Sequence, residues 1–258
     1  MKELVIIKIG GNIIDDKKAL SKFLKTYNSI SSPKILVHGG GKVTTQLSEK
    51  LGIKTKIVEG RRITDADTLN VTIMVYAGLI NKNITAKLNA KGTKAIGICG
   101  ADAFFIPSVK RKKNNIDYGF VGDVLTDKIN TKLLITLLKD NYAPIIAPIT
   151  ANAKGQLLNT NADTIASCLA KALSKKYKVK LVYCFEKEGV LNGDNVIQSI
   201  TTKTYQALKK NKIVTDGMIP KLDNAFDAIK YGVKSVAIGH AEKLKQIIQS
   251  NAGTSITK

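Results

Sequence analysis

Short apolar segments that run directly into glycine alternate with amphipathic stretches along most of this chain. Residues 4–9 lead into the glycine pair 10–11, and residues 35–38 lead into the glycine triplet 39–41. Unbroken apolar strands are typical of a parallel sheet covered on both faces, and glycine is favoured where a strand turns into a helix. The pattern predicts an α/β fold: an open, mainly parallel central sheet sandwiched between helices in three layers.

The rest of the chain continues this alternation. Helices are expected over residues 17–27 and 42–51, and a much longer one begins at Asp65 and reaches residue 89. The polar segment 110–118 separates two strand-like runs and indicates a β-hairpin. Further strands are expected at residues 94–99, 144–149, 181–184 and 233–238.

The chain has no internal repeat and no flexible linker. We therefore expect residues 1–258 to form a single domain around one continuous sheet. Its two lobes would cover about residues 1–176 and about 177–258. In an open parallel sheet, ligands bind beyond the carboxyl ends of the strands, which is where both glycine clusters fall.

A net charge of +21 on 258 residues is the outstanding feature of the composition. Most of the 41 basic residues are lysines, and only 5% of the residues are aromatic. Base readout favours arginine, and single-stranded nucleic acid is bound on aromatic side chains. The composition therefore argues against a nucleic-acid partner, and the positive field would favour small anionic substrates.

Cysteine and histidine are scarce. Cys99, Cys168 and Cys184 stand far apart, and the chain has two histidines. This argues against a disulfide framework or a zinc site and fits a reducing compartment. No apolar run reaches membrane-spanning length, and no signal peptide precedes the first strand. We expect a cytoplasmic protein without membrane association.

Two lysines stand beside glycines near opposite ends of the chain. Lys8 lies inside an apolar strand just before the glycine pair 10–11, and Lys221 follows the segment 215–220, which contains a glycine. Backbone N–H groups of glycines can approach an anion closely, and lysines neutralise its charge. Phosphoryl transfer depends mainly on positioning and charge stabilisation. The combination favours a phosphoryl-transferring enzyme, although neither a Walker A motif nor a Rossmann fingerprint is present.

Each candidate residue also has a structural alternative. Lys8 could extend its ammonium group from the end of a strand into solvent, but a lysine inside an apolar strand is unusual, which favours a functional role. Arg62 could belong to a solvated pair, and Asp163 could cap the helix that follows it. Lys221 lies near a helix start, where the helix dipole does not favour it, so an anion is expected beside it. His38 is expected to satisfy a backbone partner rather than to act as an acid or base.

Taken together, five motifs in this order and spacing resemble the amino acid kinase family over nearly the whole chain. The motifs are Lys8-Ile9-Gly10-Gly11, Val37-His38-Gly39-Gly40-Gly41, Gly60-Arg61-Arg62-Ile63-Thr64, Leu158-Asn159-Thr160-Asn161-Ala162-Asp163 and Thr215-Asp216-Gly217-Met218-Ile219-Pro220-Lys221. The resemblance is strongest to the branch of the family that phosphorylates N-acetyl-L-glutamate in arginine biosynthesis.

The resemblance implies catalytic roles for three residues. Lys8 and Lys221 would offset negative charge on the transferring phosphoryl group, and Asp163 would hold both lysines in place. On the acceptor side, Gly40 and Gly41 would donate N–H groups to the acceptor carboxylate. Arg62 would bind the substrate α-carboxylate with two hydrogen bonds, and Asn159 would bind the same end. The acylglutamate would occupy the N-terminal lobe and ATP the C-terminal lobe.

The resemblance also implies a set of nucleotide contacts. Relatives often carry serine or threonine and then aspartate after the nucleotide-lobe strand, where this chain has Phe185 and Glu186. Either Glu186 replaces that aspartate near the nucleotide, or the adenosine pocket of this chain is built differently. Magnesium would enter with ATP, held mainly by phosphates and water, so no metal-ligating residue is predicted. The implied nucleotide-binding residues are Gly10, Gly11, Glu186, Gly189, Leu191 and Thr215.

Other functions remain open at this point. The acceptor could be N-succinylglutamate or an aminoadipate derivative, because the sequence does not reveal the acyl group. The chain could instead be a catalytically silent sensor of amino acids or nucleotides. The long apolar stripe of the helix that begins at Asp65 predicts an isologous homodimer, as in relatives.

Overall fold

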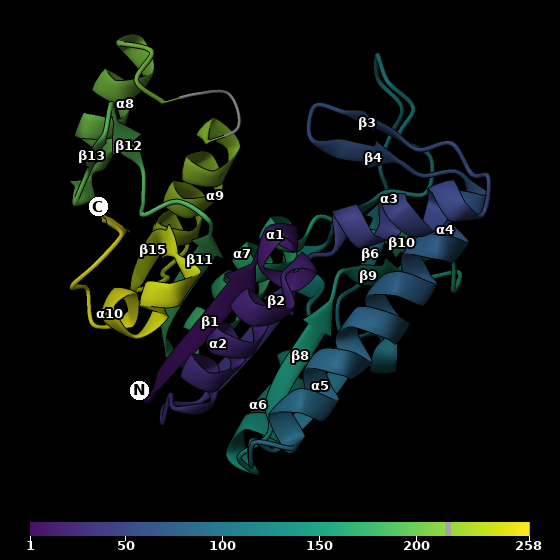
Figure 1. Cartoon of the computed structure of the whole chain (residues 1–258), viewed down its shortest axis with the longest axis horizontal. Coiled ribbons are helices and arrows are strands. Elements are labelled where there is room, and N and C mark those ends of the chain that lie inside the picture. Colours follow the sequence, from purple (N-terminus) through teal and green to yellow (C-terminus); the bar gives the residue numbers. More distant parts are fainter. Residues whose placement is uncertain (215–217, 258) are drawn as a thin grey trace.

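Eight strands form the central sheet. They are β1 (Glu3–Ile9), β2 (Lys34–His38), β5 (Ala95–Cys99), β8 (Ala143–Ala147), β11 (Lys178–Phe185), β14 (Ser199–Ile200), β15 (Ser235–His240) and β16 (Thr254–Ile256). The computed structural model describes residues 1–214 and 218–257. The strands lie in the order β14-β16-β15-β11-β1-β2-β8-β5 (Figure 1), and all neighbours are parallel except β15 and β16.

Helices cover both faces of this sheet. On one face lie α6 (Thr131–Lys139), α7 (Ala162–Ser174), α8 (Thr202–Lys210) and α9 (Ile219–Lys230). The other face carries α1 (Gly11–Asp15), α2 (Lys17–Asn28), α3 (Gly41–Lys50), a long helix described below and α10 (Leu244–Ile248). Short 3₁₀ turns are η2 (Asp102–Phe104), η3 (Thr126–Lys128) and η4 (Ala241–Lys243). The three-layer α/β prediction is confirmed.

The side chains of β1 alternate between two hydrophobic clusters, one on each face of the sheet. Leu4 and Ile6 belong to the hydrophobic cluster under α6, α7 and α9, whereas Ile7 and Ile9 belong to the cluster on the opposite face. Successive side chains of a strand point to opposite faces, so Lys8 projects on the same face as Leu4 and Ile6. This register directs a lysine toward α7.

The predicted long helix is confirmed and contains a change of geometry. Asp65 begins it, with its carboxylate accepting a hydrogen bond from the Thr68 N–H at 2.8 Å. Its parts are α4 (Ala66–Ile73), the π-helical segment η1 (Met74–Ile80) and α5 (Asn81–Asn89). Periodicity did not predict the π segment, a geometry that is common at functional sites.

The strand expected over residues 144–149 is divided in the structure. β8 ends at Ala147, and the chain continues after Pro148 in a separate strand, β9 (Ile149–Ala151). Proline has no N–H to donate to a sheet ladder, which explains the break. β9 pairs instead with β10 (Leu157–Asn159), which ends at a predicted site residue.

Three further hairpins complete the fold. They are β3–β4 (Lys56–Val58 and Arg61–Ile63), β6–β7 (Ser108–Lys110 and Gly122–Val124) and β12–β13 (Leu191–Asn192 and Asn195–Val196). The β6–β7 pair confirms the hairpin expected around residues 110–118. Figure 1 shows β3–β4 projecting beyond α3, on the side of the sheet where its strands end.

Candidate active site

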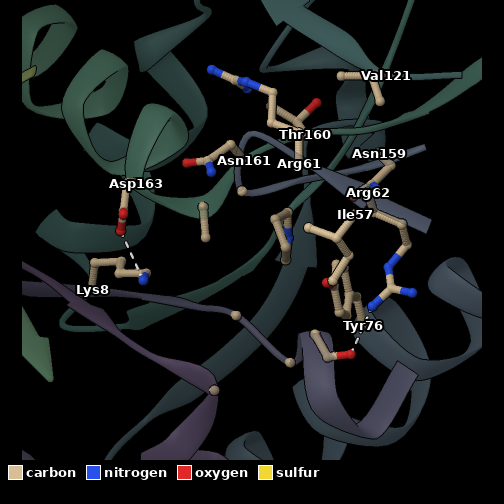
Figure 2. A pocket seen from close by; sticks show the side chains of 17 residues that line it. Lys8, Ile57, Arg61, Arg62, Tyr76, Val121, Asn159, Thr160, Asn161 and Asp163 are labelled. Atoms are coloured by element: carbon tan, nitrogen blue, oxygen red, sulfur yellow. Dashed lines mark hydrogen bonds and ion pairs between the residues drawn. The ribbon is translucent and has the colours of Figure 1, made fainter. Parts of the chain in front are cut away.

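Asp163 joins two lysines that are far apart in the sequence. Its Oδ1 lies 2.7 Å from Lys8 Nζ (Figure 2), and its Oδ2 lies 2.5 Å from Lys221 Nζ. Asp163 is in the first turn of α7 and Lys221 in the first turn of α9, and both helices pack on the face to which Lys8 points. The fold therefore brings together the three residues predicted to be catalytic, and Asp163 is the anion expected beside Lys221.

The cluster of Lys8, Asp163 and Lys221 is partly buried, which strengthens the electrostatic interactions among its charges. The side chains of Lys8 and Asp163 are each 13% exposed, and that of Lys221 is 27% exposed. Burial by itself raises the pKa of Asp163, but the two ammonium groups outweigh it and hold this pKa well below its usual range. An ionised carboxylate of this kind is a weak base. Two cations and one anion leave one positive charge available for a further anion.

The alternative that Asp163 caps its own helix is wrong. The N-cap of α7 is Asn161, whose Oδ1 accepts a hydrogen bond from the Thr164 N–H at 3.0 Å. Because Asn161 fills the cap position, the Asp163 carboxylate binds the two lysines instead.

Gly40, where β2 turns into α3, lies where no side chain fits. Its φ is +150°, and a Cβ there would lie 2.2 Å from Ile80 Cδ1 and 3.1 Å from Tyr76 Cε1. Ile80 and Tyr76 belong to η1, so the π-helical segment packs directly against the glycine loop. Within the described part of the chain, no side chain caps α3, so its first N–H groups can receive a ligand.

His38 ties this glycine loop to the long helix from inside the core. The ring is fully buried, with Nδ1 2.9 Å from the Gly39 carbonyl oxygen and Nε2 3.2 Å from Asn81 Nδ2. Burial lowers the pKa of His38 to about 4. The ring is therefore neutral at pH 7, so that Nδ1–H donates to Gly39 and Nε2 accepts from Asn81. The predicted backbone partner of His38 is confirmed.

Arg62 belongs to β4 of the β3–β4 hairpin and is only 7% exposed. Its Nη2 donates to the Gly41 carbonyl oxygen and to Thr45 Oγ1, both at 2.8 Å. Its Nη1 is buried and has no hydrogen-bond partner among the described residues. A buried guanidinium nitrogen without a partner is costly unless an acceptor fills the space beside it. The alternative of a solvated Arg62 is therefore wrong.

Asn159 lies close to the end of β4, the strand that carries Arg62. Its Nδ2 donates to Thr64 Oγ1 at 3.1 Å, and Thr64 Oγ1 donates to the Arg62 carbonyl oxygen at 3.0 Å. Asn159 ends β10, which pairs with the short strand after Pro148. The Asn159 side chain and the Arg62 backbone come from distant segments, and Thr64 links them through two hydrogen bonds.

These groups line one cavity of about 240 Å³ (Figure 2). The predicted residues in its wall are Lys8, Gly11, Gly40, Gly41, Arg62, Asn159 and Asp163. The wall also contains residues that the sequence did not single out as site residues: Gly39, Ile57, Gly60, Arg61, Tyr76, Val121, Pro148, Thr160, Asn161 and Ala162. Tyr76 shows why they were missed. Helical periodicity assigns it to an apolar face but does not reveal that the glycine loop lies opposite.

The predicted nucleotide-binding residues lie along the neighbouring ends of β1 and β11. The Gly10 N–H donates to the Cys184 carbonyl oxygen at 3.3 Å, which ties the loop after β1 to β11. Glu186 follows β11 directly and is exposed, and Leu191 is half-buried at the start of β12. The position of Glu186 at a strand end suits a ligand contact, which stays a prediction.

Gly189 and Thr215 are the other two predicted nucleotide contacts. Gly189 is buried, and a Cβ there would lie 2.7 Å from Thr254 Oγ1 and 2.8 Å from Val196 Cγ1. Packing alone therefore requires glycine at this position. Thr215 lies outside the described residues.

Within residues 1–214 and 218–257, no group of three or more histidine, cysteine, aspartate or glutamate side chains is arranged to hold a metal ion. In that same part of the chain, every helix is too short or too polar to cross a bilayer.

Comparison with known proteins places this geometry in context. The model of the "Amino acid kinase family" matches residues 3–240. The chain is 54% identical to the acetylglutamate kinase of Cytophaga hutchinsonii, over 97% of the chain and 96% of that protein. It is 49% identical to the acetylglutamate kinase of Phocaeicola vulgatus, over the full length of both chains.

Solved structures show the same fold. A Streptococcus mutans protein, 28% identical, superposes with a TM-score of 0.81 over 100% of this chain and 99% of that one. Carbamate kinase from Giardia lamblia bound to AMP-PNP, 16% identical, has a TM-score of 0.75 with coverage of 100% and 99%. At this lower identity the likeness concerns the fold alone.

Proposed function

The chain belongs to the amino acid kinase family, and we propose that it transfers the γ-phosphoryl group of ATP to the side-chain carboxylate of N-acetyl-L-glutamate. The products are ADP and N-acetyl-L-glutamyl 5-phosphate, a step of arginine biosynthesis. Full-length relatives at 49% and 54% identity carry the name acetylglutamate kinase, which supports this acceptor.

The observation that carries the proposal is the Lys8–Asp163–Lys221 cluster beside the glycine loop. Lys8 and Lys221 would neutralise the charge that spreads over the phosphoryl oxygens as the bond to the leaving ADP oxygen breaks. Asp163 would keep both ammonium groups in position. The acceptor is a carboxylate that is already ionised at neutral pH, so the reaction needs no general base. The low pKa of Asp163 agrees with that requirement.

On the acceptor side, Arg62 supplies the best-defined contact. Its buried Nη1 has no partner among the described residues and would bind the substrate α-carboxylate. The N–H groups of Gly40 and Gly41, at the start of α3, would receive the reacting carboxylate. Asn159, linked to Arg62 through Thr64, would bind the same end of the substrate as Arg62.

ATP would lie over the carboxyl ends of β11 and β15, in the part of the chain from about residue 177 onward. Gly10 and Gly11 would line its phosphates, with Glu186, Gly189, Leu191 and Thr215 around the nucleotide. Magnesium would accompany ATP and offset phosphate charge. The Asp163 carboxylate, which lines the same cavity as the glycine loops, is already bound by two lysines, so phosphates and water would hold the ion.

Assembly and location complete the proposal. Met74 and Leu79 of η1 are 55% and 51% exposed, which favours an isologous homodimer through the long helix. Light scattering should give twice the chain mass, and a monomer would contradict this. Three unpaired cysteines suit the reducing cytoplasm, where ATP is also available.

A coupled assay of ADP release tests the function. ADP release should require N-acetyl-L-glutamate, and hydroxylamine should trap the acyl phosphate as a hydroxamate. Arg62→Lys keeps the charge but loses the two-pronged contact, so the KM for N-acetylglutamate should rise about tenfold or more while the KM for ATP stays unchanged. Binding without ADP release would indicate a sensor, and equal turnover of free glutamate would overturn the acceptor assignment.

A further inference from the structure

Tyr183 stands beside Lys8 in the central sheet. β1 and β11 are parallel neighbours, and their register pairs Lys8 with Tyr183. Paired residues of adjacent strands point to the same face of a sheet, so both side chains are directed toward α7, which packs on β1 and β11. Tyr183 is 2% exposed and does not belong to the described residues that line the acceptor cavity. It therefore lies behind the Lys8–Asp163–Lys221 cluster rather than in the substrate cavity.

The hydroxyl of Tyr183 is bonded to the first turn of α7. It donates a hydrogen bond to the backbone carbonyl oxygen of Asp163 at 3.3 Å. Burial, and then the negative charge of Asp163, raise the pKa of Tyr183 well above its ordinary value, so the hydroxyl keeps its proton and remains a donor. Regular helical geometry directs the same carbonyl oxygen to the N–H of Ser167. The tyrosine is therefore an additional donor, which the helix itself does not require.

A second polar contact joins α7 to α9. One helical turn after Asp163, Ser167 Oγ donates to the carbonyl oxygen of Asn224 at 3.4 Å. Asn224 belongs to α9, the helix that carries Lys221 in its first turn. The contacts of Tyr183 and Ser167 thus connect β11 with the two helices that supply the charged groups of the cluster.

The rest of the contact between β11 and α7 is apolar. Tyr183 shares its face of β11 with Val179 and Leu181, and all three belong to the hydrophobic cluster under α7. Apolar packing is not directional, so it holds the helix on the sheet without preventing small shifts. A hydrogen bond has a preferred distance and angle. Of these three side chains, Tyr183 is the one that can fix the start of α7 in position.

The two contacts of the Asp163 carboxylate make this position important. Oδ1 lies 2.7 Å from Lys8 Nζ, and Oδ2 lies 2.5 Å from Lys221 Nζ. Figure 2 shows the first of these contacts, between the start of α7 and β1. Charge-assisted contacts are strong at short distances, so a small displacement of the first turn of α7 would weaken both at once. Phosphoryl transfer depends mainly on positioning, and displaced lysines would stabilise the transition state less.

We propose that Tyr183 is a positioning residue of the phosphoryl-transfer step: its hydroxyl fixes the start of α7, and thereby the Asp163 carboxylate, relative to Lys8 and Lys221. The inference rests on the proposed function and adds to it a residue that touches neither substrate. Tyr183 makes and breaks no covalent bond and transfers no proton. Its contribution is to keep the two ammonium groups aligned with the charge that develops on the phosphoryl group.

The first test compares Tyr183→Phe with the unmodified protein in the ADP-release assay. The phenylalanine ring fills the same space, so the melting temperature should fall by less than about 4 °C. The kcat should fall about tenfold, the equivalent of one neutral hydrogen bond, whereas both KM values should change by less than about twofold. Tyr27→Phe is the matched control, because Tyr27 is fully buried on the opposite face and its hydroxyl has no hydrogen-bond partner among the described residues. Its kcat should equal that of the unmodified protein.

A double-mutant cycle separates positioning from a general structural role. In the Asp163→Asn background, Tyr183→Phe should lower kcat by less than about twofold, because no charged carboxylate remains to be held. A general structural loss would lower kcat by the same factor in both backgrounds. An unchanged kcat in the single variant, or a tenfold loss in both backgrounds, would overturn the inference.

Chemical labelling of Lys8 tests the same inference without catalysis. An ammonium group held by a carboxylate reacts slowly with trace acetic anhydride, because only the free amine is a nucleophile. Mass spectrometry should find Lys8 labelled about threefold faster in Tyr183→Phe, and at the unmodified rate in Tyr27→Phe. Equal labelling in all three proteins would overturn the inference. Absence of ADP release by the unmodified protein would instead defeat the proposed function, and the labelling of Lys8 would still show whether Tyr183 positions Asp163.

Discussion

The acceptor side and the nucleotide side of this site are built differently. Around the acceptor cavity, Gly40 is pressed against η1, His38 lies inside the core and Arg62 is 7% exposed. Along the nucleotide side, Glu186 is exposed and the hairpin β12–β13 has strands of two residues each. The acceptor pocket is therefore part of the packed core, whereas the nucleotide side, apart from β11 and the buried Gly189, includes short and exposed segments. Single changes should cost more on the acceptor side.

The Asp163 cluster joins the two sides and should show the largest effect. If Asp163 organises both lysines, Lys8→Ala and Asp163→Asn should each lower kcat about a hundredfold, or about 3 kcal/mol, because each removes transition-state stabilisation. The double variant should lose little more than either single variant, since the residues act as one unit. Steady-state kinetics of the three proteins check this. If the fold-decrease in kcat of the double variant equals the product of the fold-decreases of the two single variants, Asp163 does not organise Lys8.

A pair of glycine substitutions tests the difference between the two sides directly. Gly40→Ala should lower the free energy of unfolding by about 3 kcal/mol, because φ is +150° and Ile80 Cδ1 lies 2.2 Å from the new Cβ. It should also raise the KM for the acylglutamate.

Gly10→Ala is the matched control on the nucleotide side. Its φ is −78°, and the nearest atom to a new Cβ is the Cys184 carbonyl oxygen at 3.9 Å. Its effect on unfolding should stay below about 1 kcal/mol. Urea denaturation compares the two variants, and similar losses would contradict a rigid acceptor side and a tolerant nucleotide side.

The buried His38 predicts a pH dependence of stability that belongs to the acceptor side. The unfolded chain takes up a proton at His38 near pH 6.5, whereas the folded chain resists it until about pH 4. The free energy of unfolding should therefore fall as the pH drops through this window, by about 2 kcal/mol between pH 7 and pH 5. Unfolding of His38→Gln should lack this part of the slope. An identical pH profile in the variant would show that His38 does not carry it.

The smallest effect is expected at Glu186. Glu186→Gln should raise the KM for ATP by only about threefold, because an exposed side chain at a strand end contributes little over water. The KM for the acylglutamate should stay constant. Glu188→Gln is the control, since Glu188 belongs to the same loop but pairs with Lys243 at 2.9 Å. A large kcat loss in Glu186→Gln would place that residue in the chemistry and remove the contrast between the two sides.

Local patterns were sufficient for most of the fold. The apolar runs ending in glycine predicted the core strands β1 and β2, and Asp65 predicted the start of the long helix. The division of the 144–149 run at Pro148 was missed, although proline itself carried the signal. The π-helical geometry of residues 74–80 has no such local signal, because it is stabilised where the helix packs on the glycine loop.

By itself, the sequence determined which residues of the site carry charge and which must be glycine, because motif order and residue chemistry are local properties. Only the tertiary structure decided which of them meet. The ion pairs of Asp163 with Lys8 and Lys221 depend on strand register and on the packing of α7 and α9. The opposite directions of Arg61 and Arg62 follow from the pleat of β4, yet their different surroundings depend on elements distant in the chain. Burial and partner choice arise from long-range packing, and that is why no local pattern could distinguish a solvated arginine pair from two arginines that line one cavity.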